Sequence, residues 1–195
     1  MVVGVKVKIR PFMKGDEEAY VRVHNEGYST ETWYGSLEKV LKLEDFSEMS
    51  YDSTFLADVK GIVVGLIDIK IRKKIGDIEN LVVLPRYRGK GIGKALLEKA
   101  IEFLKDKVEK IRVETPIQNK KAVEFYFKNG FKHTTKAYII ESQNKSKLKP
   151  YLSRSFYFVG DSRYWIPSNK QMELLKKLKA DFTIVGRFKV MIKTF

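Results

Sequence analysis

The spacing of apolar positions predicts strands along much of the chain. VKVKIRPF, near the N-terminus, alternates with a period of two, as a half-buried strand does. The stretch TFLADVKGIVVGLIDIKIR predicts two strands that turn at Lys60-Gly61, and DIENLVVLP predicts another strand that Pro85 ends. Further strands are expected over KIRVETP, FKHTTKAYIIES, SFYFVG and the alternating segment from Phe182 to Ile192.

Between these strands, apolar residues at spacings of three and four predict helices. Local signals support their ends: Asp16 is an N-cap residue, Gly130 is typical of a C-terminus, and Ser168 begins an S-x-x-Q capping box. The stretch SQNKSKLKP, residues 142–150, is expected to be a linker or loop. The helices are predicted from Asp16 to about Gly27, Leu37 to Leu43, Gly91 to Lys107, Asn119 to Gly130, and Ser168 to about Ala180.

The helix predicted from Gly91 has no residue that would cap its N-terminus. Helices usually begin at Ser, Thr, Asp or Asn, and none of these lies between Leu81 and Leu97. An uncapped N-terminus exposes free N–H groups and a partial positive charge, and glycines let a ligand reach that backbone. The stretch therefore predicts an anion site, most naturally for phosphate. It contains three glycines and four cations: Gly89, Gly91, Gly93, Arg86, Arg88, Lys90 and Lys94.

Two common phosphate-binding patterns do not fit this stretch. A P-loop needs G-x-x-x-x-G-K-[ST], but Arg88 stands where the first glycine belongs and Ala95 replaces the hydroxyl residue. The dinucleotide fingerprint G-x-G-x-x-G also fails, because the spacing here is G-x-G-x-G. Neither pattern therefore identifies the phosphate ligand.

Composition narrows the chemistry further. The 195 residues suffice for one full domain, and they include no cysteine and only two histidines, His24 and His133. Disulfides, thiolate catalysis and cysteine-type zinc sites are thereby excluded, and no metal is expected. No run of about 18 apolar residues predicts a membrane span. Abundant Lys, Glu and Ile fit a heat-adapted intracellular protein, so a cytoplasmic location is predicted.

Basic charge is concentrated in the last quarter of the chain. Residues 142–195 hold 12 basic and 3 acidic side chains, which is most of the net charge of +14. One interpretation is a nucleic-acid-associated protein whose basic, aromatic C-terminal segment binds phosphate backbone or recruits a substrate. The alternation of Phe156 and Phe158 and the lack of a nucleic-acid motif favour a structural strand-helix-strand unit instead. The aromatic and basic residues concerned are Tyr151, Arg154, Phe156, Tyr157, Arg163, Tyr164 and Trp165.

Two motifs carry a resemblance to a known family. L-x-V-x-P-x-x-R-G-x-G-I-G runs from Leu81 to Gly93, and N-x-x-A-x-x-F-Y-x-x-x-G-F runs from Asn119 to Phe131. Both resemble signatures of the GNAT N-acetyltransferases, and the resemblance covers roughly Lys6 to Glu141. It implies an α/β (α+β) fold with a mixed, mostly antiparallel central sheet flanked by helices. Residues 1–146 would form this domain, and 147–195 a small basic extension docked on the core or on a partner subunit.

The resemblance also implies an activity and a cosubstrate. The expected reaction transfers an acetyl group from acetyl-CoA to a primary amine by direct attack in a ternary complex. Backbone groups of Leu81 to Val83 would pair with the pantetheine arm, and N–H groups from Gly89 to Lys94 would hold the pyrophosphate. The expected acetyl-CoA contacts are Leu81, Val82, Val83, Arg88, Gly89, Lys90, Gly91, Ile92, Gly93, Lys94, Asn119 and Tyr126.

Catalytic roles follow from the same resemblance. Tyr126 matches the family tyrosine that assists departure of the CoA thiolate, a role for which a neutral phenol is suited. Asp77 and Glu79 are favoured as general base over Glu114, because Arg112 occupies the position where one branch of the family has its glutamate. The acceptor groove would be lined by Tyr28, Trp33 and Tyr34. The sequence leaves open the identity of the acceptor and whether the chain forms a homodimer, and nucleic acid is not favoured as a partner.

Overall fold

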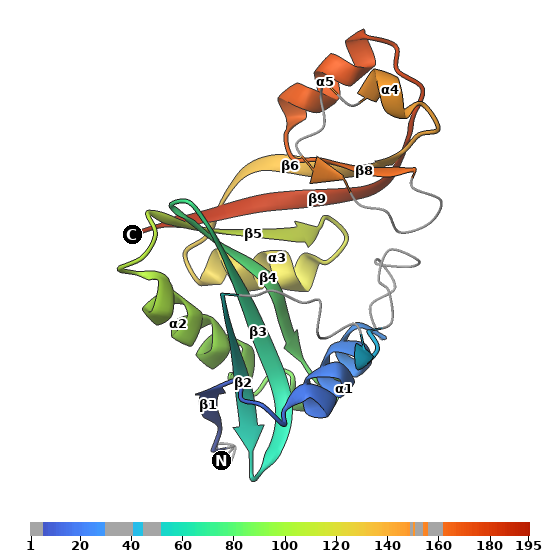
Figure 1. Ribbon diagram of the computed structural model, residues 1–195. Helices are drawn as coiled ribbons and strands as arrows, with labels where there is room; N and C mark the ends of the chain where they lie inside the picture. The colour runs from blue at the N-terminus through green and yellow to red at the C-terminus, as the bar shows by residue number, and fades with distance from the viewer. Residues whose placement is uncertain (1–5, 30–40, 45–51, 149, 151–153, 156–161) are drawn as a thin grey trace. The chain divides into compact units, whose positions relative to one another are not determined.

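The computed structural model describes residues 6–29, 41–44, 52–148, 150, 154–155 and 162–195 (Figure 1). The chain divides into two compact units. Unit 1 comprises Met1–Val113 with Lys193–Phe195, and unit 2 comprises Glu114–Ile192. The division falls within strand β5 (Lys110–Pro116), whereas the sequence places a domain boundary at residue 146.

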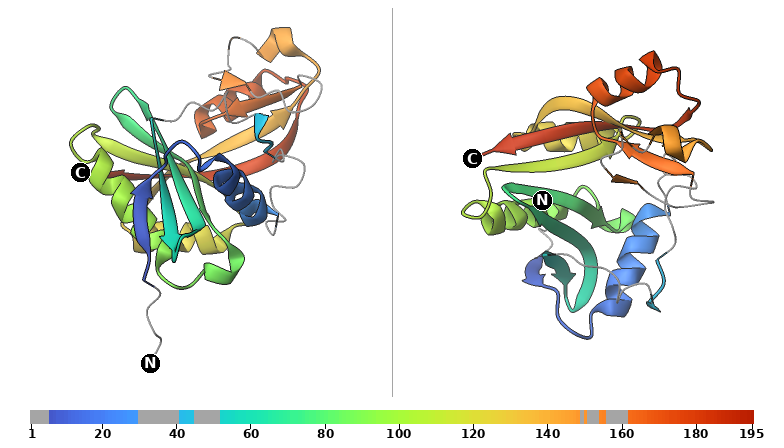
Figure 2. Two further views of the ribbon diagram at one scale, coloured as in Figure 1. Left: turned by 60° about the horizontal axis from the view of Figure 1, so that its bottom comes forward. Right: turned by 45° about the horizontal axis from the view of Figure 1, so that its top comes forward.

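Unit 1 is built on a sheet whose strands follow one another in chain order. Strands β1 (Lys8–Pro11), β2 (Ser53–Val59), β3 (Ile62–Arg72) and β4 (Ile75–Val83) pair antiparallel, and β5 begins parallel to β4 (Figure 2). Lys60 and Gly61 have φ of 54° and 83°, the left-handed conformations of a tight hairpin turn. The predicted mixed, mostly antiparallel sheet is confirmed.

Two helices cover opposite faces of this sheet. On one face of β3, Asp68 accepts a hydrogen bond from Tyr20 of helix α1 (Glu17–Tyr28). On the other face, a Cβ at Gly65 would meet Leu96 of helix α2 (Ile92–Leu104). Even and odd positions of a strand face opposite sides, so the two helices lie on different faces, to either side of β3 in Figure 1. A short 3₁₀ helix, η3 (Pro85–Tyr87), connects β4 to α2.

Asp16 precedes α1 as predicted, but it does not cap the helix with its side chain. Its carboxylate instead accepts hydrogen bonds from Arg10 at 2.6 and 2.8 Å and from the Met13 N–H at 2.9 Å. The Arg10 guanidinium lowers the pKa of Asp16. This ion pair ties the end of β1 to the beginning of α1. The acidic pair Glu17 and Glu18 in the first turn complements the helix dipole.

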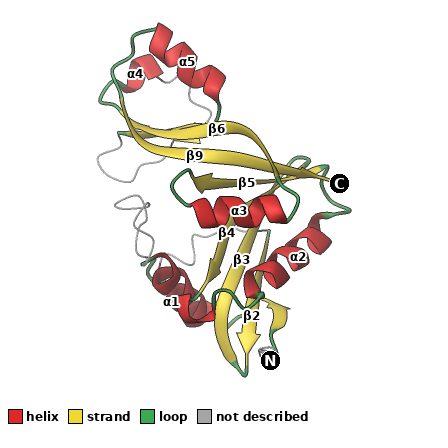
Figure 3. Ribbon diagram, turned by 180° about the vertical axis from the view of Figure 1, so that it is seen from behind, coloured by secondary structure: helices red, strands yellow, loops and turns green. Residues whose placement is uncertain are grey.

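Unit 2 is organised around two long antiparallel strands. Strand β9 (Thr183–Thr194) pairs with β6 (Lys132–Glu141), β8 (Arg163–Ile166) pairs with β6 on its other edge, and β7 (Arg154–Ser155) pairs with β8. Helices α4 (Lys145–Leu148) and α5 (Asn169–Lys177) lie together at one end of this ribbon (Figure 3). Helix α3 (Lys120–Lys128) precedes β6, and Gly130 follows it at φ 85°.

Some elements of unit 2 differ from the sequence prediction. The expected linker at 142–150 contains α4, whose Leu148 is fully buried in a core formed with Tyr164, Met172 and Leu175. Strand β8 was not predicted because RYWI is too short to show a period. Residues 156–160 of the predicted strand SFYFVG lie outside the described residues.

The structure also bears on the helix predicted at Leu37–Leu43 and on helices that could span a membrane. Of the helix predicted at Leu37–Leu43, residues 37–40 lie outside the described residues, and residues 41–43 are not helical. Among the described helices, none has the length and apolar character that crossing a membrane requires.

Candidate active site

The N-terminus of α2 is left without a cap. Gly91 occupies the N-cap position in the left-handed conformation at φ 79°, and no described side chain caps the helix there. The first N–H to find a partner is that of Ala95, which donates to the Gly91 carbonyl at 3.0 Å. Within the described residues, the N–H groups of residues 89–94 donate no hydrogen bond. These backbone N–H groups form a row of hydrogen-bond donors that can bind an acceptor supplied by a ligand.

This turn is also accessible and positively charged. A Cβ added at Gly89 (φ 74°) or at Gly91 would meet no atom of the described residues within 4 Å, so the space beside these two glycines is open there. Lys90 and Lys94 are exposed, and the Lys90 ammonium lies 5.2 Å from the centre of the Tyr87 ring. Free N–H groups, a helix dipole and nearby cations fit a phosphate group.

Arg88 braces the turn with its side chain. Its Nε donates to the Val83 carbonyl at 2.9 Å, and its Nη2 donates to the Gly27 carbonyl at 2.9 Å. The guanidinium thus connects the end of β4 to the end of α1. Sequence reasoning placed Arg88 among the ligand contacts and missed this bracing role, which no spacing of residues signals.

The second half of β4 has an open edge. Parallel pairing with β5 ends at Ile78↔Val113, while β3 pairs with β4 as far as Val83. The β3–β4 register runs from Asp68↔Asn80 to Ile69↔Ile78, so Glu79 is the extra residue of a β-bulge. Among the described strands, Leu81–Val83 therefore pair with β3 alone. Their outer backbone groups can bind an extended ligand that carries amides, although the Val83 carbonyl already accepts a hydrogen bond from Arg88.

Asp77 and Glu79 converge on one arginine, as their shared face predicts. Arg72 donates through Nη1 to Asp77 Oδ2 and, at 2.6 Å, to Glu79 Oε1. Arg112 adds bonds to both Asp77 oxygens, at 2.5 and 2.9 Å. The Asp77 side chain is 5% exposed and the Glu79 side chain 30%. Glu79 Oε2 has no hydrogen-bond partner within the described residues, whereas both Asp77 oxygens are occupied.

A buried carboxylate that sequence reasoning missed lies on β3. Asp68 is fully buried and accepts hydrogen bonds from Tyr20 at 2.6 Å, Thr54 at 2.6 Å and Asn80 at 2.9 Å. Burial raises its pKa to about 6, although these bonds oppose the shift. The Tyr28 hydroxyl in turn donates to Asn80 Oδ1 at 2.8 Å. The available signal is the single aspartate inside the apolar strand IVVGLIDIKIR.

Asn119 and Tyr126 belong to unit 2, whereas the glycine turn belongs to unit 1. Asn119 caps α3, since its Oδ1 accepts from the Ala122 N–H at 3.0 Å. Tyr126 is 5% exposed, with its ring edge-to-face against Phe125 and Phe131. Burial raises the pKa of the Tyr126 phenol. Its hydroxyl has no hydrogen-bond partner in the part of the chain that the structure describes.

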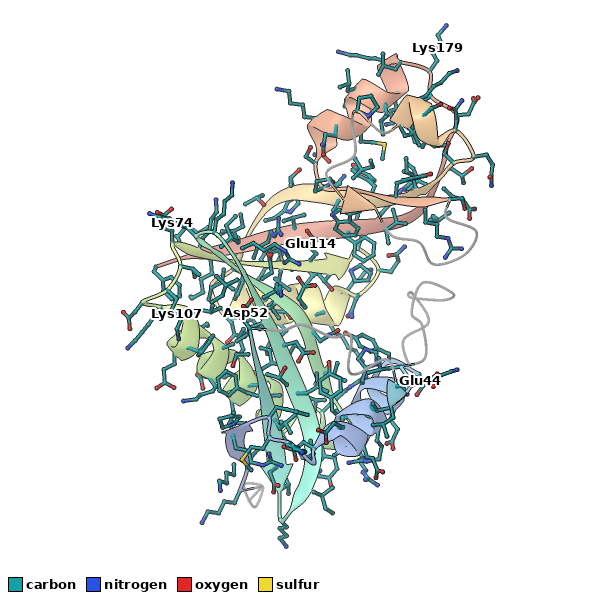
Figure 4. The ribbon with its side chains drawn as sticks, viewed as in Figure 1. Glu44, Asp52, Lys74, Lys107, Glu114 and Lys179 are labelled. Atoms are coloured by element: carbon teal, nitrogen blue, oxygen red, sulfur yellow. The ribbon has the colours of Figure 1, made fainter. Side chains whose placement is uncertain are left out.

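The remaining candidates are distributed over both units. Tyr28 is half-buried at the end of α1, while Trp33 and Tyr34 lie outside the described residues. Glu114 lies on β5 (Figure 4). Tyr164 and Trp165, named above for base stacking, are 1% and 5% exposed and so present little surface to a base. The described residues contain no group of three or more His, Cys, Asp or Glu arranged to hold a metal.

Comparison with known proteins places this geometry in context. The model of the acetyltransferase (GNAT) family matches residues 18–131. An uncharacterized N-acetyltransferase of Archaeoglobus fulgidus is 33% identical over 115 residues, which are 54% of this chain and 78% of that protein. A spermidine N(1)-acetyltransferase of Thermoplasma acidophilum is 34% identical over 118 residues, 58% of this chain and 73% of that protein.

A solved structure resembles the chain over nearly its whole length. The PaiA N-acetyltransferase of Thermoplasma acidophilum, determined in complex with coenzyme A, superimposes with a TM-score of 0.59. The match covers 97% of this chain and 99% of that one, at 19% sequence identity. At that identity the likeness shows a common fold.

Proposed function

The chain belongs to the GNAT family and is an acetyl-CoA-dependent N-acetyltransferase, and on that premise we propose that it acetylates a primary amine by direct attack in a ternary complex. The observation that carries the proposal is the row of N–H groups at residues 89–94 without an acceptor. The pyrophosphate of acetyl-CoA supplies the anionic oxygens that such a row binds. The open edge of β4 at Leu81–Val83 suits the amides of the pantetheine arm.

Glu79 is proposed as the general base. An alkyl ammonium has a pKa of roughly 10.4, so it must lose a proton before its nitrogen can attack. Glu79 offers an oxygen, Oε2, that no described residue occupies, and its side chain is partly exposed. Both oxygens of Asp77 instead accept hydrogen bonds from arginine side chains, Arg72 and Arg112. These bonds orient the Arg72 guanidinium, which also bonds to Glu79.

Tyr126 is proposed as the general acid. When the amine nitrogen bonds to the acetyl carbon and the C–S bond breaks, the leaving thiolate needs a proton. Because burial raises its pKa, the Tyr126 phenol keeps its proton at neutral pH. No described residue competes for its hydroxyl hydrogen. Asn119 supports the same segment by capping the helix that carries Tyr126.

Replacement of the phenol tests the role of Tyr126. Tyr126→Phe should lower kcat by roughly 10- to 1000-fold, the range of general-acid effects, with little change in the Kd of acetyl-CoA. Tyr138→Phe is the matched control, since it removes a hydroxyl from unit 2 that bonds to Asn169 at 2.9 Å. Thiol release from acetyl-CoA measures turnover. A Tyr126→Phe enzyme with normal kcat would make this side chain a packing residue.

Direct attack and the choice of acceptor can be tested together. The sequence has no cysteine, so no thiolate is available in it to carry an acetyl group. Mass spectrometry after incubation with acetyl-CoA alone should therefore show no acetylated enzyme intermediate. Spermidine, a lysine-containing peptide and a peptide with a free N-terminal alanine represent three amine classes, of which the relative named for spermidine makes the first a natural starting point. We place the enzyme in the cytoplasm on the support of its composition.

A further inference from the structure

A chain of hydrogen bonds crosses three strands of unit 1 and ends at a half-buried tyrosine. Thr54, Asp68 and Asn80 are directly opposite one another on β2, β3 and β4. Thr54 donates to Asp68 Oδ1 at 2.6 Å, and Asn80 Nδ2 donates to Asp68 Oδ2 at 2.9 Å. On the far side of Asn80, the Tyr28 hydroxyl donates to Oδ1 at 2.8 Å.

The carboxylate fixes the direction of every bond in this chain. An ionised carboxylate only accepts, so the amide nitrogen of Asn80 must face Asp68 and the amide oxygen must face Tyr28. With a pKa of about 6, Asp68 is mainly ionised at neutral pH. The hydroxyl hydrogen of Tyr28 is thereby committed to Asn80. Toward any further partner, the Tyr28 oxygen acts as a hydrogen-bond acceptor.

Tyr28 also lies against the part of β4 that carries the candidate chemistry. Asn80, its partner, directly follows Glu79, whose Oε2 has no hydrogen-bond partner among the described residues. A Cβ at Gly27 would lie 2.0 Å from Val82 Cγ1, so only glycine allows α1 to approach β4 this closely. Arg88 holds the same point by bonding to the Gly27 carbonyl. The end of α1 is thus pressed against the half of β4 that has an open edge.

We propose that the Tyr28 oxygen accepts a hydrogen bond from the N–H of the acceptor amine, and that Asp68 and Asn80 are positioning residues that keep this oxygen an acceptor. The inference rests on the proposed function, because it assigns a group to the amine of that reaction. An amine approaching Glu79 carries N–H groups in excess of the proton it gives up. A fixed acceptor bonded to Asn80, the residue that follows the base on β4, would orient the nitrogen lone pair toward the thioester.

Propylamine is the appropriate first probe, because the amine is its only polar group. Tyr28→Phe should lower kcat/KM for propylamine about 10-fold, which corresponds to about 1.4 kcal/mol, and should leave the Kd of acetyl-CoA unchanged. Asp68→Asn should act in the same direction. An amide nitrogen at residue 68 that faces Asn80 turns the Asn80 oxygen toward itself, so the Asn80 nitrogen then donates to the Tyr28 oxygen and occupies it. Thr54→Val is the matched control: it removes a bond to the same carboxylate but leaves Asn80 facing as before.

An exchange of the two polar groups sharpens the test. In the double variant Asp68→Asn with Asn80→Asp, residue 80 becomes the carboxylate and Tyr28 must again donate to it. Its kcat/KM for propylamine should return to within about threefold of wild type, a rescue that a merely structural role does not predict. If Asp68→Asn does not fold, Tyr28→Phe alone decides, because Tyr28 is only half-buried.

The outcomes separate this inference from the proposed function. Acetylation of propylamine at equal kcat/KM by wild type and Tyr28→Phe would overturn the role of Tyr28 and leave the proposed function intact. A loss in Thr54→Val as large as in Asp68→Asn would overturn the positioning role. Failure of the wild-type enzyme to acetylate propylamine, spermidine or either peptide would overturn the proposed function itself, and this inference with it.

Discussion

The N-termini of α5 and α2 solve the same problem in opposite ways. At α5 the chain provides Ser168, whose Oγ accepts from the Gln171 N–H at 3.2 Å, as the capping box predicts. At α2 it provides Gly91, and no side chain among the described residues caps the helix. Both helices have the same free N–H groups at their first turn. A helix that satisfies these groups internally is complete, whereas one that leaves them exposed beside cations is suited to an anionic ligand.

The largest effect should come from obstructing the open turn. Gly91→Val should weaken acetyl-CoA binding about 100-fold or more, because bonds to a charged phosphate contribute roughly 1.5–3 kcal/mol each and at least two would be lost. Calorimetric titration measures the change. Gly61→Val is a matched control: Gly61 also has a positive φ, 83° against 79°, and a Cβ there also meets nothing within 4 Å. Equal affinity in wild type and Gly91→Val would remove the turn from the binding site.

Asp68 is the reverse of the open turn: it is a buried acceptor surrounded by hydrogen-bond donors. Its folded-state pKa of about 6 exceeds the ordinary value near 4, so ionising it costs the folded protein more than the unfolded chain. The stability from this group is complete below pH 4 and falls as pH rises toward 6. The free energy of unfolding of wild type minus that of Asp68→Asn should decline by roughly 2–3 kcal/mol over this window. A pH-independent difference between the two denaturation profiles would contradict the assignment.

The smallest effect should come from the satisfied helix. Ser168→Ala removes the cap of α5 and should cost about 1 kcal/mol, a drop in Tm of roughly 2–4 °C for a chain of this length. Thermal unfolding followed by circular dichroism measures it. The Kd of acetyl-CoA and kcat should stay unchanged, because this cap serves the fold. A change in acetyl-CoA affinity as large as that of Gly91→Val would erase the contrast between the two helices.

The sequence predicts those features that depend on neighbours along the chain. The uncapped α2, the capping box at Ser168 and the Lys60-Gly61 hairpin each follow from a few adjacent residues. The shared face of Asp77 and Glu79 follows from the period of a strand.

Features that depend on distant partners could not be predicted. Asp16 accepts hydrogen bonds from Arg10, and Arg88 donates to the Gly27 carbonyl. Asp68 accepts from Tyr20, which lies 48 positions away in the sequence. The same reason explains α4, where the buried Leu148 makes a helix of a stretch whose composition predicts a loop.

Backbone NMR during titration with acetyl-CoA tests the central claim most directly. The amide signals of residues 89–94 should shift most strongly and change their temperature dependence as the N–H groups acquire acceptors. The amides of residues 169–171, at the capped start of α5, should remain in place. Saturable binding with unmoved signals at residues 89–94 would contradict the account, because the ligand would then be held elsewhere.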